Sequence, residues 1–224
     1  MRALVLAAPW HPDRVRVEPV SPEVLVARVA ALVAGHPRAG GAVRVLVDGH
    51  PSTHPETLAD QLVEPLRVAG RPTARIGVRD FLRPASLRLE HGHEDPDSLL
   101  DEWIDVGALN REVLTAVGPD GDGRYLPSLR DPVTSRSTRA DYVEAPPGLV
   151  VLLDGSLSLG RGLDVDLTVH LALQDATLAR RTPPADAWTL PAYARYRAEV
   201  APERDADVVV RVDDARRPAW VDVR

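Results

Sequence analysis

The segment Val43–Leu62 carries the strongest chemical signal in the sequence, because a strand, a loop and a helix follow one another as in phosphate-binding loops. An apolar run leads into Gly49, and an amphipathic helix follows the loop. A phosphate-binding loop of this type needs the pattern G-x-x-x-x-G-K-[ST]. Counted from Gly49, the second glycine is replaced by His54, the lysine by Pro55 and the Ser/Thr by Glu56. The segment keeps the layout of such a loop without its phosphate-binding residues.

These replacements remove groups that a phosphate needs. Glycines let backbone N–H groups approach phosphates closely, and Pro55 has no N–H group. Glu56 places a carboxylate in the first helical turn, where an anion would otherwise bind. No other lysine can substitute, because all 27 Lys and Arg residues are arginines. The residues left to meet a phosphate are Asp48, Gly49, Ser52, Thr53, His54, Glu56 and Thr57.

The same residues fit a helix start that needs no ligand. Thr53 to Glu56 match the capping box S/T-x-x-E, with Thr53 as the N-cap and Pro55 in the first turn. The sequence therefore predicts a loop that has been rebuilt as a self-capped helix start.

Composition limits the partners that the chain can have. Its 224 residues suit one domain with a sizeable core, and its net charge is −6. The arginines are scattered, so we expect no nucleic-acid partner. There is no cysteine, which excludes disulfides and thiolate chemistry, and no apolar run approaches the length of a membrane span. We expect a cytoplasmic protein with no membrane partner, and the composition is typical of a GC-rich bacterial genome.

Apolar runs and helical periodicity alternate along most of the chain. The predicted strands are Val43–Asp48, Thr73–Val78, Leu149–Leu153, Leu167–Leu173 and Asp207–Val212. The predicted helices lie near Thr57–Ala69, Pro96–Trp103, Ala108–Ala116, Gln174–Arg181 and Pro191–Val200. Strands separated by helices imply a parallel sheet that is covered on both faces. Tyr125–Tyr142 is polar and is predicted to be a long surface loop.

The first 41 residues precede this alternating pattern. A strand near Val15–Val20 and a helix from about Ser21 to Ala34 are predicted there, ahead of Gly40 and Gly41. We assign residues 1–41 to an N-terminal extension and residues 42–224 to the main domain.

Three further groups of polar residues carry candidate chemistry. Asp154 follows an apolar run, where it can help to hold a cation or cap a loop. Arg83 and Arg136 can bind an anion through their guanidinium forks or form surface ion pairs. His91 and His93 have carboxylates beside them and are the best metal candidates, but no further ligand of matched spacing completes a site. A solvated loop is favoured there, and we assign no metal ligand.

Short motifs occur in an order that carries a family resemblance. They are Asp80-Phe81-Leu82-Arg83, Asp95-Pro96-Asp97, Trp103-Ile104-Asp105, Arg130-Asp131 with Arg136, an apolar strand ending in Asp154-Gly155, Arg180-Arg181, and Tyr196 followed by Pro202 and Ala206-Asp207. In this order they resemble the uridine kinase family of P-loop nucleoside kinases. The resemblance covers most of residues 43–213. It implies a three-layer α/β P-loop kinase fold with a parallel core sheet and an N-terminal extension.

The resemblance also implies roles for individual residues. Asp80 would be the base that takes a proton from the acceptor hydroxyl, and Asp154 would assist Mg²⁺. ATP and Mg²⁺ would be the cofactors of an active enzyme. The substrate-binding residues would be Arg83, Asp105, Asp131 and Arg136, and the lid arginines would be Arg180 and Arg181.

The chain departs from the family where the chemistry takes place. The family's catalytic carboxylate lies two residues before the aromatic residue of its D-x-F motif, where this chain has Arg79. Neighbouring strand residues point to opposite faces, so Asp80 can substitute only if the strand has ended or slipped there. The lid is also short, at Arg181–Asp186. These losses remove most of the charge neutralisation that phosphoryl transfer requires.

Three functions remain open from the sequence. The first is an NTP-dependent phosphotransferase that acts on a nucleoside or similar small hydroxyl compound. The second is a non-catalytic pseudokinase that binds a small ligand or a protein partner through the acceptor-side pocket, and the chemistry favours it. The third is a metal-dependent enzyme that uses His91 and His93. A nucleoside-like small molecule is the expected ligand of the first two, and a homo-oligomer is left open.

Overall fold

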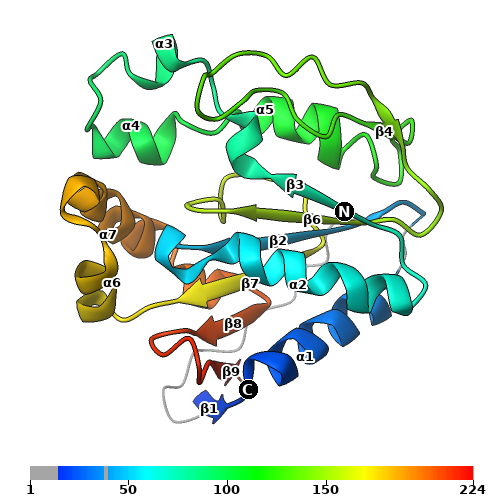
Figure 1. Cartoon of the computed structure of the whole chain (residues 1–224), viewed down its shortest axis with the longest axis horizontal. Coiled ribbons are helices and arrows are strands. Elements are labelled where there is room, and N and C mark those ends of the chain that lie inside the picture. Colours follow the sequence, from blue (N-terminus) through cyan, green and yellow to red (C-terminus); the bar gives the residue numbers. More distant parts are fainter. Residues whose placement is uncertain (1–14, 38–39, 224) are drawn as a thin grey trace.

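One mixed sheet lies at the centre of the molecule (Figure 1). The computed structural model describes residues 15–37 and 40–223. The strands of the main sheet in this part of the chain are β1 (Val15–Pro19), β2 (Val43–Gly49), β3 (Thr73–Gly77), β6 (Val150–Gly155), β7 (Leu167–Ala172), β8 (Val208–Arg211) and β9 (Ala219–Val223). Their order is β1-β9-β8-β7-β2-β6-β3, and those from β8 to β3 are parallel. The predicted parallel core sheet is confirmed.

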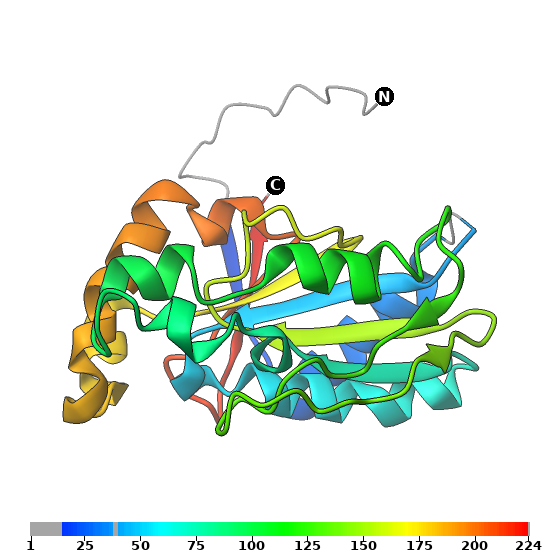
Figure 2. The same cartoon turned by 90° about the horizontal axis from the view of Figure 1, so that it is seen from above.

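Helices cover both faces of this sheet and make three layers (Figure 2). The α-helices are α1 (Pro22–Gly35), α2 (Pro55–Val68), α3 (Ala85–Arg88), α4 (Pro96–Asp101), α5 (Val106–Leu109), α6 (Asp175–Arg181), α7 (Leu190–Glu199) and α8 (Pro202–Asp205). Shorter turns are the 3-10 segments η2 (Pro51–Thr53), η3 (Val78–Phe81) and η5 (Pro184–Thr189) and the π-helical turn η4 (Asn110–Leu114). A small hairpin pairs β4 (Arg124–Tyr125) with β5 (Val143–Glu144).

β2 shows why both faces need cover. All of its residues are buried, and alternate side chains point to opposite faces. Val45 and Val47 pack with α1 and α2, whereas Leu46 packs with α5 and α7 on the other face. A strand that is buried on both sides reads as an almost continuous apolar run, which is how the sequence presents it.

The connections make the carboxyl end of β2 the natural place for a ligand. β2 lies between β6 and β7, so the chain leaves it for β3 on one side and later crosses to β7 on the other. Ligands of such sheets bind where the strand order reverses, outside the carboxyl ends of the strands. The register places Asp48 of β2 opposite Gly155 of β6 and His170 of β7. The loops after β2 and β6 therefore open at the same edge.

The predicted strand and helix ahead of residue 42 are both present. β1 pairs antiparallel with β9 at one edge of the main sheet. The α1 side chains Leu25, Val29 and Val33 are buried in the same hydrophobic cluster as α2 and β2. Residues 1–14 of the predicted extension lie outside the described residues.

Several features of the fold differ from the sequence predictions, which lacked α3, α8, β4 and β5. β9 was not predicted, although it pairs with β8 and β1. The helix predicted over Ala108–Ala116 is observed as α5, which begins at Val106 and continues into the π-helical turn η4. Of the predicted surface loop Tyr125–Tyr142, Tyr125 belongs to β4 and is buried, and the other residues lie between the two strands of the β4–β5 hairpin.

Candidate functional site

A cavity of about 720 Å³ opens at the carboxyl edge of the sheet. One wall is the loop after β2, and further walls come from the ends of β3 and β6, from the segment around α4, and from η5 and α7. The aromatic and apolar side chains include Trp103, Trp188, Tyr193, Leu82, Leu99 and Ile104. The charged lining residues are Glu56, Arg79, Asp154, Arg181 and Asp186. The cavity is thus mainly apolar, with charges at separate points of its wall.

The loop after β2 uses its own amides instead of presenting them to a ligand. The Ser52 amide donates to Nδ1 of His50 at 3.1 Å. The Thr53 amide donates to the His50 carbonyl at 2.8 Å, and the His54 amide donates to the Pro51 carbonyl at 3.1 Å. The two prolines of this loop have no N–H group. Residues 51–55 therefore contribute no uncommitted amide to the cavity.

The predicted capping box is wrong. α2 has His54 as its N-cap, and no side chain caps it. The Thr53 hydroxyl donates instead to the His50 carbonyl at 2.7 Å, and Nδ1 of His54 lies 3.0 Å from Oε1 of Glu56. The physical reason is η2, which turns the Thr53 side chain back into the loop and ends on His54 in the left-handed conformation (φ 55°, ψ 58°). The backbone thus has a glycine-like conformation where the motif has its second glycine.

The first glycine of the motif is required for packing. A Cβ atom on Gly49 would lie 2.5 Å from Oγ1 of Thr53 and 3.0 Å from Cβ of Leu171. Such contacts are too close for real atoms, so Gly49 lets the loop fold back against β7.

His50 is buried and supports the turn. Because Nδ1 accepts the Ser52 amide, we infer that the ring proton lies on Nε2, which is 3.4 Å from the hydroxyl of Thr182. Burial lowers the pKa of His50 to about 4. The Tyr193 ring packs edge-on against the imidazole, with 4.5 Å between the ring centroids. His50 is therefore neutral at neutral pH and does not supply a cation for phosphate.

Arg75 of β3 lies between Asp154 and the start of α2. Its guanidinium donates to Oδ1 of Asp154 at 2.6 Å and to the Glu56 carbonyl at 2.7 Å, and it also pairs with Asp60. Burial raises the pKa of Asp154, and the neighbouring Arg75 acts in the opposite direction. The protein itself thus supplies a cation to the acid that ends β6.

Asp48 anchors the end of β2 to three other segments. Its side chain is fully buried and accepts hydrogen bonds from the Ser158 amide at 2.9 Å, from Nδ1 of His170 at 2.9 Å and from the Tyr196 hydroxyl at 3.0 Å. Asp48 does not line the large cavity. Its contacts join β2, β7, α7 and the loop after β6 behind the cavity.

Comparisons with known proteins identify the fold. No protein-family model and no curated protein matches the chain. Among solved structures, a possible uridine kinase from Bacillus stearothermophilus matches with a TM-score of 0.66 and 18% identity, over 84% of this chain and 97% of that one. The chain has the P-loop kinase fold.

Two other solved structures are similar to this chain in fold. A protein from Silicibacter sp. TM1040, described as a fructose transport system kinase, matches with a TM-score of 0.57 and 18% identity, over 77% of this chain and 94% of that one. A D-glycerate 3-kinase from Cryptococcus neoformans matches with a TM-score of 0.50 and 16% identity, over 79% of this chain and 80% of that one. At these identities the similarity concerns the fold alone. The chemistry of the site depends on the residues that this chain places in the P-loop kinase fold.

Asp80 follows β3 of the P-loop kinase fold without facing the cavity. β3 ends at Gly77, and Asp80 lies in the turn η3. Arg79 lines the cavity, whereas Asp80 does not. Burial raises the pKa of Asp80, and the charge of Arg79 opposes that rise. The structure therefore presents a cation at this part of the cavity wall.

The residues predicted to bind the acceptor lie outside the lining of the cavity. Asp105 caps α5 by accepting the Ala108 amide at 2.9 Å. Arg83 donates to the Glu102 carbonyl at 3.4 Å. Asp131 accepts backbone amides within its own surface loop, and Arg136 is exposed in the same loop.

The two predicted lid arginines have different surroundings. Arg181 lines the cavity, and its guanidinium donates to the Val212 carbonyl at 3.1 Å and to the Asp213 carbonyl at 2.8 Å. Arg180 is exposed on α6, and Thr57 is exposed on α2. Of the predicted site residues, the structure gathers Ser52, His54, Glu56, Asp154 and Arg181 around one cavity. Asp48, Gly49, Thr53 and Thr57 do not line it.

Sequence reasoning missed Arg75 and the pairing of Trp103 with Trp188. Trp103 and Trp188 contact one another at the cavity, with 6.0 Å between their ring centroids. The available signal for Arg75 was a single charge inside a short strand next to the strand that ends in Asp154. Charged residues inside strands need a partner, and Asp154 is that partner.

Two other expectations concern membranes and metals. In residues 15–37 and 40–223 no helix is long and apolar enough to span a membrane. The His91–Asp95 segment is a largely exposed turn ahead of α4. The described part of the chain contains no group of three His, Cys, Asp or Glu side chains arranged to hold a metal ion.

Proposed function

We propose that this protein binds a small, nucleoside-like molecule in the cavity and does not transfer a phosphoryl group from ATP. The engagement of the loop amides carries this proposal. A triphosphate would have to break the contacts that His50 and Pro51 make with the amides of residues 52–54. It would then still meet two prolines and the carboxylate of Glu56 at the start of α2.

The Mg²⁺ ion that accompanies ATP does not fit these residues. Oδ1 of Asp154 is already bound to the guanidinium of Arg75 at 2.6 Å. A divalent cation beside Asp154 would be repelled by that guanidinium. Glu56 also stands where the motif supplies a Ser/Thr hydroxyl to the metal. These residues therefore do not form a site for Mg²⁺.

The lining of the cavity supports a ligand with a flat or apolar body. Its volume of about 720 Å³ suits a small organic molecule, and its wall contains apolar side chains such as Leu82, Leu99 and Ile104. Trp103, Trp188 and Tyr193 provide aromatic faces against which a ring can pack. Arg79 and Asp186 are two charged lining residues that can fix its orientation.

A phosphotransferase is the second candidate, and the position of the cavity favours it. The cavity lies between the loop after β2 and Asp154, as the kinase-like phosphotransferase fold requires. This function would need the loop to rearrange, Asp80 to turn towards an acceptor hydroxyl, and ATP with Mg²⁺ to displace Arg75 from Asp154. Binding of a protein partner through the same pocket is the remaining alternative.

Calorimetry distinguishes these candidates. We expect no heat of binding for ATP with Mg²⁺ at millimolar concentration, and micromolar binding for at least one nucleoside without ATP. Micromolar affinity for ATP, or ATP-dependent phosphorylation of a nucleoside, would contradict the proposal. Absence of binding by every nucleoside would direct attention to protein partners.

Two tryptophan variants test whether the cavity is the binding site. Trp188→Ala removes an aromatic wall, so we expect it to weaken nucleoside binding about tenfold, or about 1.4 kcal/mol. Trp220→Ala is the matched control, because Trp220 lies on β9 and packs against Arg28 away from the cavity. Equal losses in both variants would place the ligand elsewhere.

A further inference from the structure

Residues 83–103 form a lobe whose two ends meet at one neck, and the Ala85 amide makes a further contact with the body by donating to the Ser135 hydroxyl at 3.1 Å. At the neck, Leu82 and Ile104 form an isolated antiparallel bridge. The Arg83 amide donates to the Trp103 carbonyl at 2.9 Å, and the Asp105 amide donates to the Phe81 carbonyl at 2.9 Å. Both ends of the lobe therefore lie side by side, and the lobe carries α3 and α4 (Figure 1).

The lobe has internal contacts that hold its shape. The Ser98 hydroxyl donates to the Arg88 carbonyl at 2.8 Å, and Nε of Arg88 donates to the Arg83 carbonyl at 2.9 Å. The Arg88 guanidinium also lies over the ring of Trp103, 4.9 Å from its centroid. A segment that is tied within itself in this way can move as a unit.

The lobe is also a wall of the cavity. Leu99 and Trp103 of the lobe line it, and Trp103 contacts Trp188 of η5. We call the space between the lobe and the η5–α7 segment the gap. A ligand of the cavity is therefore enclosed between the lobe and the η5–α7 segment. Moving the lobe away from α7 would widen the entrance.

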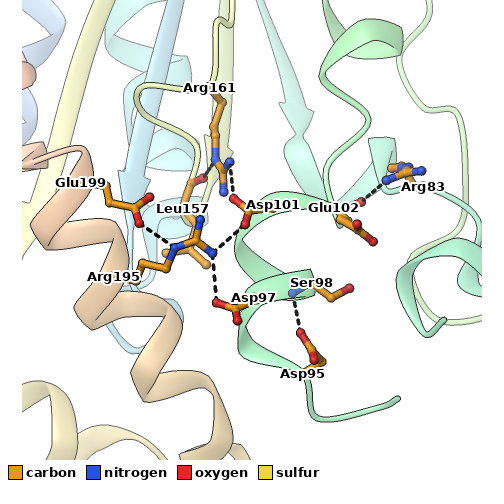
Figure 3. A network of polar contacts seen from close by, with 10 residues as sticks. All are labelled: Arg83, Asp95, Asp97, Ser98, Asp101, Glu102, Leu157, Arg161, Arg195 and Glu199. Carbon is orange, nitrogen blue, oxygen red and sulfur yellow. Dashed lines mark hydrogen bonds and ion pairs between the residues drawn. The ribbon is translucent and has the colours of Figure 1, made fainter. Parts of the chain in front are cut away.

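A cluster of ion pairs connects the lobe to the body (Figure 3). Arg195 of α7 contacts Asp97 at 3.0 Å and Asp101 at 2.6 Å, both on α4. Arg161, from the loop after β6, reaches Asp101 at 3.3 Å. Glu199 contacts Arg195 at 2.7 Å, but it lies on α7 itself and so does not bridge the gap.

These ion pairs are weak enough to open. The side chain of Arg195 is 34% exposed, that of Asp101 42% and that of Asp97 77%. Exposed pairs contribute little individually and are screened by salt, although a shared arginine couples them. α7 is held more firmly, because its Tyr196 is buried and bonded to Asp48. The lobe is also held by Leu100 of α4, which is buried in the same apolar cluster as Tyr196. Opening must therefore withdraw Leu100 as well as break the ion pairs.

We propose that the lobe is a gate over the cavity and that Arg195, with Asp97 and Asp101, is a salt-sensitive latch that keeps the gate closed. This proposal rests on the proposed function, because it assigns a means of regulating access to the same cavity. The latch sets how often the cavity opens to solvent, and high ionic strength releases it.

Thiol labelling measures this opening without any ligand, because the chain has no cysteine of its own. Val78 lines the cavity and is 2% exposed, so the labelling rate of Val78→Cys reports opening of the cavity. Val210 is fully buried in β8 away from the cavity, so Val210→Cys reports global unfolding. We expect Arg195→Ala to raise the rate for Val78→Cys about tenfold and to change the rate for Val210→Cys far less.

Two isosteric variants separate the latch from the helix that carries it. Asp101→Asn removes a pair that bridges the gap, and Glu199→Gln removes a pair within α7. We expect only Asp101→Asn to accelerate labelling of Val78→Cys. Raising NaCl from about 0.05 M to about 1 M should accelerate labelling in the chain with an intact latch and have a smaller effect with Arg195→Ala, which keeps the Arg161–Asp101 pair.

Equal acceleration at both cysteines, or equal effects of Asp101→Asn and Glu199→Gln, would overturn the gate. A cavity that opens by this route but binds no nucleoside would contradict the proposed function alone. The two proposals can therefore fail separately.

Discussion

His54 has a backbone conformation that suits glycine better than any other residue. We predict that His54→Gly exceeds His54→Ala in free energy of unfolding by about 1 kcal/mol. Both variants lose the contact with Glu56, and only glycine relieves the left-handed strain. Urea unfolding at neutral pH measures the difference. Equal midpoints would mean that the strain is absent.

His50 makes stability depend on pH. Burial lowers its pKa to about 4 in the folded protein, from 6.5 when it is unperturbed. The unfolded chain therefore binds the proton first, so the free energy of unfolding rises between about pH 4 and pH 6.5 and levels off above. The part due to His50 is about 3 kcal/mol at neutral pH and is lost as the pH falls towards 4.

We predict that His50→Gln flattens this rise in urea midpoints measured between about pH 7 and pH 4.5. His93→Gln is the control, because His93 is exposed ahead of α4. If the free energy of unfolding rises equally with pH in His50→Gln, a group other than His50 takes up the proton.

For individual residues, the sequence predicted which motif positions had been replaced but not the backbone conformation or the hydrogen bonds of the loop. The motif spacing alone identified His54, Pro55 and Glu56. The capping box failed because Thr53 has two acceptable partners, a helix amide and the His50 carbonyl, and the turn geometry decides between them. Which amides remain available is a property of that geometry.

Arg75 links β3, β6 and the start of α2, so its effect belongs to the elements that it joins. We predict that Arg75→Met lowers the free energy of unfolding by about 3 kcal/mol, because Asp154 is left buried without its cation. Adding Asp154→Asn should restore part of the loss. Chemical denaturation of the single and double variants measures the coupling.

Arg79→Met is the matched control for this cycle. Arg79 is exposed at the cavity, and its replacement should change stability by no more than about 0.5 kcal/mol. Additive effects of Arg75→Met and Asp154→Asn would show that the two residues do not act as a pair.

Strands and helices were predictable wherever burial imposes a regular pattern. β2, β6 and β7 are buried on most positions and read as apolar runs. β9 has no such run, because Asp222 interrupts its apolar residues, and of Ala219 to Asp222 only Val221 is buried. The π-helical turn η4 was not predictable, since a helical pattern does not reveal one extra residue in a turn.

The whole molecule depends on the segment that precedes β2. α1 shares one hydrophobic cluster with α2, and β1 extends the main sheet. We predict that a chain of residues 42–224 loses cooperative thermal unfolding, because Leu25, Val29 and Val33 no longer cover that face. Circular dichroism at increasing temperature tests this.

A chain that begins at residue 15 keeps β1 and α1 and serves as the control. If residues 42–224 alone unfold in one sharp transition at the same temperature, the extension does not contribute to the stability of the main domain.

The arrangement of the whole chain followed from the order of its motifs, whereas the composition of the cavity did not. The motif series gave the P-loop kinase fold, because successive strands and helices determine the topology. The walls of the cavity come from segments that are distant in sequence, such as those of Trp103 and Trp188. Arg83 and Asp131 match the family motifs yet face other partners.

The contacts of Asp48 have a kinetic consequence. Its three hydrogen bonds span 110, 122 and 148 residues of chain. Such contacts form only when segments distant in the chain have come together, which costs loop-closure entropy. We expect their loss to raise the unfolding rate more than it lowers the folding rate. Asp48 is thus expected to determine how long the native state persists once it has formed.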